Sequence, residues 1–213
     1  MGAGMSGFLR ISAFLALILA VAGCATSPSS PVQSRSNIES PDLAAAIDPP
    51  AIAALDQDEV ADLARSILAL SPLVDPEEAA RAAALSYSHT AALKVQYQIT
   101  DPPLIHNAKV NSGARPRGLC WHWAEDMEKR LLAENFRTLD LHRAIANHDN
   151  IRIDHSTAII SAKGATMFDG VVIDPWRKGG TLTWMAVTED RRYKWRPQAE
   201  VLEFYRQRDA KKS

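Results

Sequence analysis

The hydrophobic period of the sequence changes once along the chain, and this change limits the folds that the chain can adopt. Up to about residue 135, apolar residues recur at the three- and four-residue spacing of amphipathic helices. Beyond that point they alternate with polar residues, as in strands, between clusters of turn-forming residues. Helices followed by strands with short connections predict an α+β domain in which helices pack on an antiparallel sheet.

Two helices with no expected chemistry come first. The first carries its apolar residues at helical spacing and stops near Ser71-Pro72: Val60, Leu63, Ala64, Ile67 and Leu68. The second begins at Asp75, which can cap it, followed by Pro76 at the first helical position, and continues to about Lys94. Glu78 is placed to reach back to the cap and complete a capping box.

The next segment, residues 99–118, contains Pro102, Pro103, Gly113 and Pro116 with little periodicity, so it is predicted to be a long loop. A third helix is expected over Leu119–Asn135. Its inward face carries Cys120, Ala124, Met127 and Leu131. Strand-like runs follow at 138–146, 151–162 and 170–174, and the basic segment after Glu189 is expected to be a solvated helix end.

An uncharged apolar segment of thirteen residues, Ile11–Gly23, lies near the N-terminus after Arg10. A helix of that length is too short for a hydrocarbon core roughly 30 Å thick, so the segment is typical of a signal peptide. Its end, Val21-Ala22-Gly23-Cys24, resembles the lipobox of bacterial lipoproteins. The resemblance implies cleavage before Cys24 and acylation of its thiol, and the uncharged Ala25 implies sorting to the periplasmic side of the outer membrane. The alternative is an ordinary signal peptide followed by an incidental cysteine.

This interpretation divides the chain into three parts. Residues 1–23 are expected to be a lipoprotein signal peptide. Residues 24–50, rich in Ser, Pro and Ala, are expected to carry the lipid and to form a flexible tether. Residues 51–213 are expected to fold as a single α+β domain of ordinary size.

Composition excludes several classes of protein. The chain has 24 Lys+Arg against 25 Asp+Glu, which is not the basic excess of a nucleic-acid binder. Its two cysteines rule out a disulfide framework and a zinc site of four cysteines. A metal site from Cys120, His122 and His106 is disfavoured, because residues two apart on a helix point in nearly opposite directions. Neither a metal nor a cofactor is therefore expected.

If Cys24 carries lipid, Cys120 is the single thiol of an exported domain. A lone thiol in an oxidising compartment is open to oxidation, so its presence calls for an explanation. Cys120 lies in the first turn of its predicted helix, where unpaired backbone N–H groups and the positive end of the helix dipole favour a thiolate. The alternative is that Cys120 is a small buried apolar residue, as many free cysteines are.

A thiolate nucleophile needs a base and a group that orients the base. Alternation along the strand from Ile151 places His155 in an apolar, core-facing row with Ile153 and Thr157, whereas Ser156 faces the other way. Asp174 ends the next strand, where its carboxylate can accept from the imidazole and fix its orientation. Each of these residues also has a purely structural reading, as a satisfied core histidine or a turn-forming aspartate.

Order and context together resemble the transglutaminase-like branch of the papain-like cysteine enzymes. The matching features are Gly118-Leu119-Cys120 opening a helix, His155 on a strand about 35 residues later, and Asp174-Pro175 with Trp176 ending the next strand. The resemblance covers roughly residues 101–176. It implies that Cys120 is the nucleophile, His155 the general base and acid, and Asp174 its partner. Members of the group often carry an aromatic residue two places after the histidine, where this chain has Thr157.

The implied reaction is acyl transfer at a peptide or isopeptide bond, with a thioester resolved by water or by an amine. One oxyanion donor is expected from the backbone N–H of Cys120, and candidates for a second are Asn107 and His106. The expected substrate is a peptide or protein, such as a cell-wall peptide, and Cys24 is the expected membrane contact. A non-catalytic envelope-binding lipoprotein, using residues 106–117 as its contact surface, is the alternative.

Overall fold

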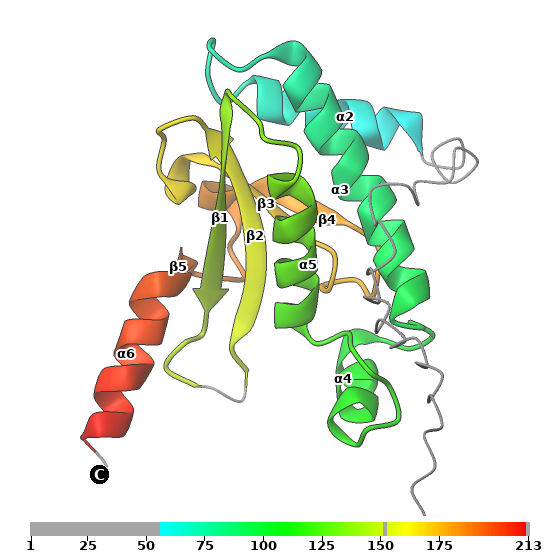
Figure 1. Ribbon diagram of the computed structural model, residues 1–213, viewed down its shortest axis with the longest axis vertical. Helices are drawn as coiled ribbons and strands as arrows, with labels where there is room; N and C mark the ends of the chain where they lie inside the picture. Colours follow the sequence, from blue (N-terminus) through cyan, green and yellow to red (C-terminus); the bar gives the residue numbers. More distant parts are fainter. Residues whose placement is uncertain (1–55, 151–152, 212–213) are drawn as a thin grey trace, which may run out of the picture. The chain divides into compact units, whose positions relative to one another are not determined.

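A five-stranded antiparallel sheet forms the centre of the fold, in the order β4-β3-β2-β1-β5 (Figure 1). The structure is a computed structural model that describes residues 56–150 and 153–211. The strands are β1 (Leu139–Ala146), β2 (His155–Ala162), β3 (Val171–Asp174), β4 (Thr183–Ala186) and β5 (Arg196–Pro197). The expectations about the signal segment, Cys24 and the tether lie outside the described residues.

Five α-helices accompany the sheet in the described part of the chain: α2 (Gln57–Leu68), α3 (Pro76–Gln96), α4 (Pro103–Asn111), α5 (Cys120–Leu132) and α6 (Gln198–Ala210). The prediction of an α+β domain with an antiparallel sheet is confirmed. None of these helices is both long and apolar enough to cross a bilayer.

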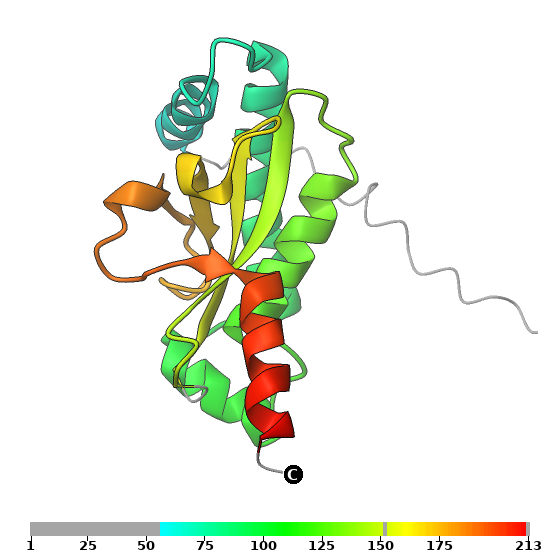
Figure 2. The ribbon, with the colours of Figure 1, turned by 90° about the vertical axis from the view of Figure 1, so that its left-hand side faces the viewer.

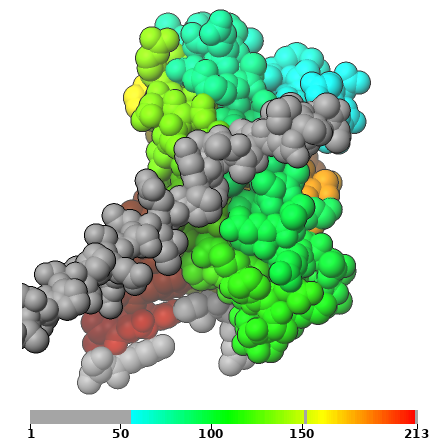
Figure 3. All heavy atoms as spheres, turned by 45° about the vertical axis from the view of Figure 1, so that its right-hand side comes forward, coloured from blue at the N-terminus to red at the C-terminus, as the bar shows by residue number. Residues whose placement is uncertain are grey.

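The two faces of the sheet have separate hydrophobic cores. Helices α2, α3 and α5 cover one face, and α2 packs along α3 (Figures 1 and 3). The other face is covered by two 3-10 turns, Met167–Asp169 and Val187–Glu189, and by the chain segment before β5. These segments lie on the side of the sheet away from α5 (Figure 2). The residues of this second core are Ala144, Ala146, Ile159, Met167, Val172, Val187, Tyr193 and Trp195.

Because both faces are covered, every residue of β2 is buried. Ser156 is therefore buried as well, at 7% exposed against 2% for His155 and 1% for Thr157. Ile153 was predicted to share the row of His155, and this prediction is wrong. Its side chain is 59% exposed, because β2 begins only at His155.

The start of α3 follows the predicted cap but not the predicted capping box. One carboxylate oxygen of Asp75 accepts from the backbone N–H groups of Glu77 and Glu78, at 2.8 and 3.1 Å. Glu78 does not reach back to the cap. Its carboxylate accepts from the N–H groups of Arg137 and Thr138, at 2.9 and 2.8 Å, and so ties α3 to the start of β1.

The predicted loop over residues 99–118 is wrong, because it contains helix α4. Pro103 occupies the first helical turn, where a missing N–H costs nothing. The helix buries only His106 fully, whereas Leu104 and Ile105 are exposed. A short helix with so narrow a buried face has no apolar periodicity to detect.

Candidate functional site

Cys120 is the first residue of α5, as predicted, and it is only partly buried. The Nδ1 atom of His122 accepts from the backbone N–H groups of Gly118 and Leu119, at 3.2 and 3.1 Å. Burial lowers the pKa of His122, and the charge of Arg117 lowers it further, so this imidazole is neutral. His122 thereby satisfies donors that precede the helix, and the N–H of Cys120 is among the first helical amides, which have no intrahelical acceptor.

The structure brings His155 and Asp174 into direct contact. The Nε2 of His155 donates to the Oδ2 of Asp174 at 2.7 Å, and the two side chains are 2% and 1% exposed. The other ring nitrogen, Nδ1, is buried and has no hydrogen-bond partner of good geometry among the described residues. The Cys120 thiol interacts with the same ring and raises its pKa. The sulfur of Cys120 lies 3.8 Å from the backbone oxygen of Asp154, the residue before His155.

This environment favours the charged forms of both partners. Burial by itself lowers the pKa of His155, but the charge and hydrogen bond of Asp174, with a smaller contribution from Cys120, raise it to about 9. Burial tends to raise the pKa of Asp174, and the charges of His155 and Arg177 overcome this effect and lower it. At neutral pH the pair is therefore an imidazolium and a carboxylate.

Asp174 is held by Arg177, a residue that the sequence analysis did not single out. The backbone N–H and the Nε of Arg177 donate to Asp174 at 3.1 and 2.9 Å. The far end of the same guanidinium donates to Asp190 at 2.7 Å. Arg177 lies three residues after Asp174, a spacing that suits such a contact, but no local pattern marks Asp190.

Aromatic rings surround the imidazole of His155. The centroids of Trp176, Tyr193 and Trp195 lie 4.8, 4.5 and 5.4 Å from its own. Asp190 accepts from the backbone N–H of Tyr193 at 3.3 Å and from the indole N–H of Trp195 at 3.0 Å. One carboxylate thus fixes both Arg177 and part of the aromatic enclosure that keeps water from the His155–Asp174 pair.

The two candidate oxyanion donors have other partners. The side-chain oxygen of Asn107 accepts from the indole N–H of Trp176 at 3.1 Å. Asn107 therefore orients the ring of Trp176, which packs near the imidazole of His155. The Nε2 of His106 donates to the backbone oxygen of Arg117 at 2.9 Å in a buried position. His106 therefore supports the turn before Cys120, and the backbone N–H of Cys120 remains the candidate oxyanion donor.

Thr157 is buried and donates to the backbone oxygen of Ile173 at 2.9 Å. It links β2 to β3 and presents no side chain to a ligand. No group of three His, Cys, Asp or Glu residues in the described ranges is arranged to hold a metal ion.

The three candidate residues, Cys120, His155 and Asp174, thus come from α5, β2 and β3 and meet at one end of the sheet. A thiol beside a charged imidazole, which is itself held by a carboxylate, is an arrangement suited to nucleophilic attack on a carbonyl carbon. No model of a known protein family, no curated protein and no solved structure matches this chain.

Proposed function

We propose that this chain is a cysteine enzyme with a transglutaminase-like fold that carries out acyl transfer on peptide or isopeptide bonds. The observation that carries the proposal is the buried contact of 2.7 Å between His155 and Asp174, made on an imidazole that also interacts with Cys120. The Nδ1 atom of this ring has no hydrogen-bond partner of good geometry among the described residues, and the Cys120 thiol interacts with the same ring.

In the proposed reaction the Cys120 thiolate attacks the carbonyl carbon of the amide and forms a C–S bond. The oxyanion of the tetrahedral intermediate accepts from the backbone N–H of Cys120. As the C–N bond breaks, the imidazolium of His155 gives its Nδ1 proton to the leaving amine. Neutral His155 then takes a proton from water or from an acceptor amine, which attacks the thioester and releases the thiolate.

The proposed setting is the cell envelope, where lipid on Cys24 would hold the domain at the periplasmic side of the outer membrane. Peptides of the cell wall or segments of another envelope protein are the proposed substrates. Hydrolysis and transamidation use the same three residues, so product analysis with and without an added amine separates them.

A non-catalytic binding role on the same fold is the second candidate. It is favoured by the exposed Leu104 and Ile105 on α4, the helix that replaces the predicted contact loop. For this role, Cys120→Ser leaves the cellular phenotype of the wild type intact. For the enzyme, the same substitution reproduces the phenotype of a deletion.

Thiol reactivity tests the proposed enzyme directly. In the purified full chain, Cys120 is expected to react with iodoacetamide near neutral pH at least about tenfold faster than free cysteine, with the labelled peptide identified by mass spectrometry. His155→Ala is expected to remove this advantage, whereas His148→Ala, which alters a turn, keeps it. Labelling at the rate of free cysteine in the wild type contradicts the proposal.

A further inference from the structure

A pocket of about 490 Å³ lies between α5, the start of β2 and α6. Ile145 and Ser156 line its sheet side, and residues of α6 close the opposite side. Figures 1 and 2 show α6 leaving the end of β5 on the edge of the sheet next to β1. The volume of the pocket falls within the range of sites that bind small molecules or side chains.

The pocket adjoins the candidate nucleophile. Trp121, which lines it, follows Cys120 directly in α5, and its side chain is 47% exposed. Asp154, which also lines it, carries the backbone oxygen that lies 3.8 Å from the Cys120 sulfur. A side chain bound in this pocket therefore lies beside any bond that Cys120 attacks.

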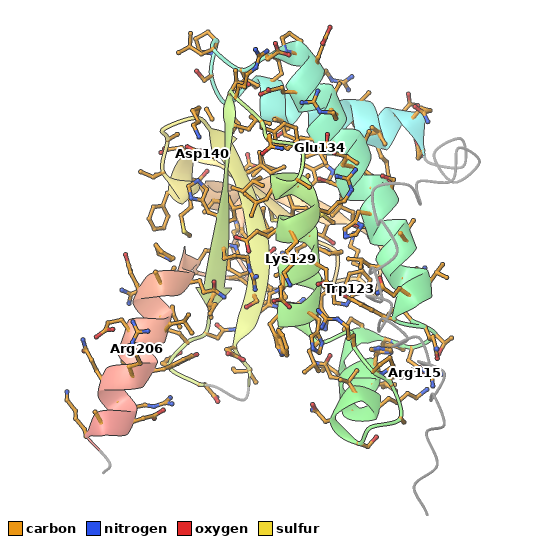
Figure 4. All side chains as sticks on the ribbon, viewed as in Figure 1. Arg115, Trp123, Lys129, Glu134, Asp140 and Arg206 are labelled. Carbon is orange, nitrogen blue, oxygen red and sulfur yellow. The ribbon has the colours of Figure 1, made fainter. Side chains whose placement is uncertain are left out.

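The charges around the pocket are unbalanced at one position. Glu125 pairs with Lys129 at 3.1 Å, and Glu128 pairs with Arg143 at 3.3 Å; Lys129 is labelled on α5 in Figure 4. The third acid, Asp154, has no Lys or Arg partner within the described ranges. Its carboxylate accepts from the hydroxyl of Tyr205 at 3.5 Å, and the charge of the neighbouring His155 also acts on it.

A half-buried carboxylate that has no Lys or Arg partner in the described ranges is complemented by a cationic ligand. The apolar surfaces of Trp121 and Leu202 suit an aliphatic stem, and the aromatic face of Trp121 suits a positive charge. The ring of Tyr205 already carries the guanidinium of Arg208, 4.9 Å from its centroid. An amine that acts as acyl acceptor must be neutral to attack, so a carboxylate suits a bound ammonium that does not react.

We infer that this pocket binds a lysine-like side chain of the peptide substrate, next to the attacked bond, with Asp154 pairing with its ammonium group. The inference rests on the proposed function, since it names the substrate class of the same site. Asp154 is then the residue that determines specificity.

Binding of matched peptides tests the inference without turnover. The full chain carrying Cys120→Ala is titrated with acetyl-Ala-Ala-X-Ala-Ala-amide, where X is Lys, norleucine or Glu. The Lys peptide is expected to bind about five- to tenfold more tightly than the norleucine peptide, which has the same stem without the charge, and the Glu peptide most weakly. Equal affinity for Lys and norleucine overturns the inference, and this comparison needs no change in the pocket.

Substitution then assigns the preference to one carboxylate. Asp154→Asn is expected to equalise the Lys and norleucine affinities and to leave norleucine binding unchanged. Asp140→Asn is the matched control and keeps the preference, because Asp140 lies at the opposite end of β1 and pairs with Lys163 at 2.6 Å (Figure 4). A preference for Lys that persists in Asp154→Asn overturns the assignment.

The two proposals fail separately. Fast labelling of Cys120 with no preference for Lys leaves the enzyme standing and removes the lysine subsite. A preference that depends on Asp154, together with a thiol of ordinary reactivity, supports the subsite and removes the enzyme.

Discussion

The two ring nitrogens of His155 have different surroundings, and this difference determines how the residue can act. Nε2 is fixed by a carboxylate, whereas Nδ1 has no hydrogen-bond partner of good geometry in the described part of the chain and belongs to the ring that interacts with Cys120. Since the pKa of the ring is raised to about 9, the imidazolium persists through the neutral range. His155 can therefore serve as the proton donor to a leaving group, and it becomes a base once that proton has left.

Removing the charge of Asp174 tests this account. In Asp174→Asn the largest favourable influence on the imidazolium is lost, so the pKa of His155 is expected to fall from about 9 to below its ordinary value of 6.5. NMR titration of the ring nitrogens measures it. Asp140→Asn, which removes a carboxylate from β1 of the same sheet, is expected to leave the pKa at about 9. An unchanged pKa in Asp174→Asn contradicts the account.

The same raised pKa makes stability depend on pH. Because His155 binds its proton more tightly in the folded chain, the stabilisation is present in full below pH 6.5 and is lost as the pH rises through about 9. The free energy of unfolding of the wild type is therefore expected to fall across this window more steeply than that of His155→Gln. Urea denaturation at a series of pH values measures the difference, and parallel curves contradict the expectation.

Among the elements, the start of α5 depends on a glycine. Gly118 has a φ of +126°, a conformation that side chains rarely adopt, and a Cβ built there would lie 2.4 Å from the Nε2 of His106. That nitrogen is the one that holds the backbone oxygen of Arg117. The turn before Cys120 and the buried imidazole of α4 are thus packed against each other.

Gly118→Ala is expected to lower the free energy of unfolding by about 2 to 4 kcal/mol. Two costs contribute, the strain of the backbone at a positive φ and the clash of the new Cβ with His106. Gly113→Ala is the control, because its φ is also positive, at +79°, while nothing lies within 4 Å of the added Cβ. It is expected to cost about 1 kcal/mol. Urea denaturation measures both, and equal losses contradict the role of His106.

What could be predicted of the elements was local in the sequence. The cap at Asp75 and the position of Cys120 depend on neighbours within one helical turn. The partner of Glu78 lies about 60 residues away and comes into reach only when α3 meets β1. Strands β4 and β5, of four and two residues, were not expected, whereas β3, also of four residues, was predicted because it is a continuous apolar run after a turn signal.

The candidate site shows the same division. Cys120, His155 and Asp174 could be proposed because helix, strand and chain order constrain them. Asp190 could not, since its partner Arg177 is 13 residues away, on the other side of β4. Two buried faces, rather than one, likewise follow from packing and not from the pattern of β2.

Across the whole molecule, the pair of Arg177 and Asp190 joins the end of β3 to the segment that covers the second face of the sheet. Both side chains are nearly inaccessible, at 9% and 1% exposed. Asp190→Ala leaves a buried guanidinium without one of its two carboxylates and is expected to cost about 3 kcal/mol of unfolding free energy. Glu203→Ala, which breaks the exposed pair with Arg206, is expected to leave the unfolding midpoint unchanged.

If Asp190 also positions the site, a second measurement will show it. Cys120 labelling in Asp190→Ala is expected to slow well below the temperature at which the variant unfolds, because Arg177 no longer holds Asp174. Wild-type labelling in a variant with lowered stability limits Asp190 to a structural role.

Because β2 is the central strand of the sheet, the geometry of the candidate site depends on whether the sheet has formed. His155 is in place only after β2 has paired with β1 and β3, which requires residues 139 to 174 to be joined in register. Until then Cys120 is an ordinary thiol, whatever the state of its own helix. The rate at which Cys120 of a refolding sample reacts with iodoacetamide is therefore expected to rise when β2 pairs with β1 and β3. This rate can be used to follow the formation of the native sheet.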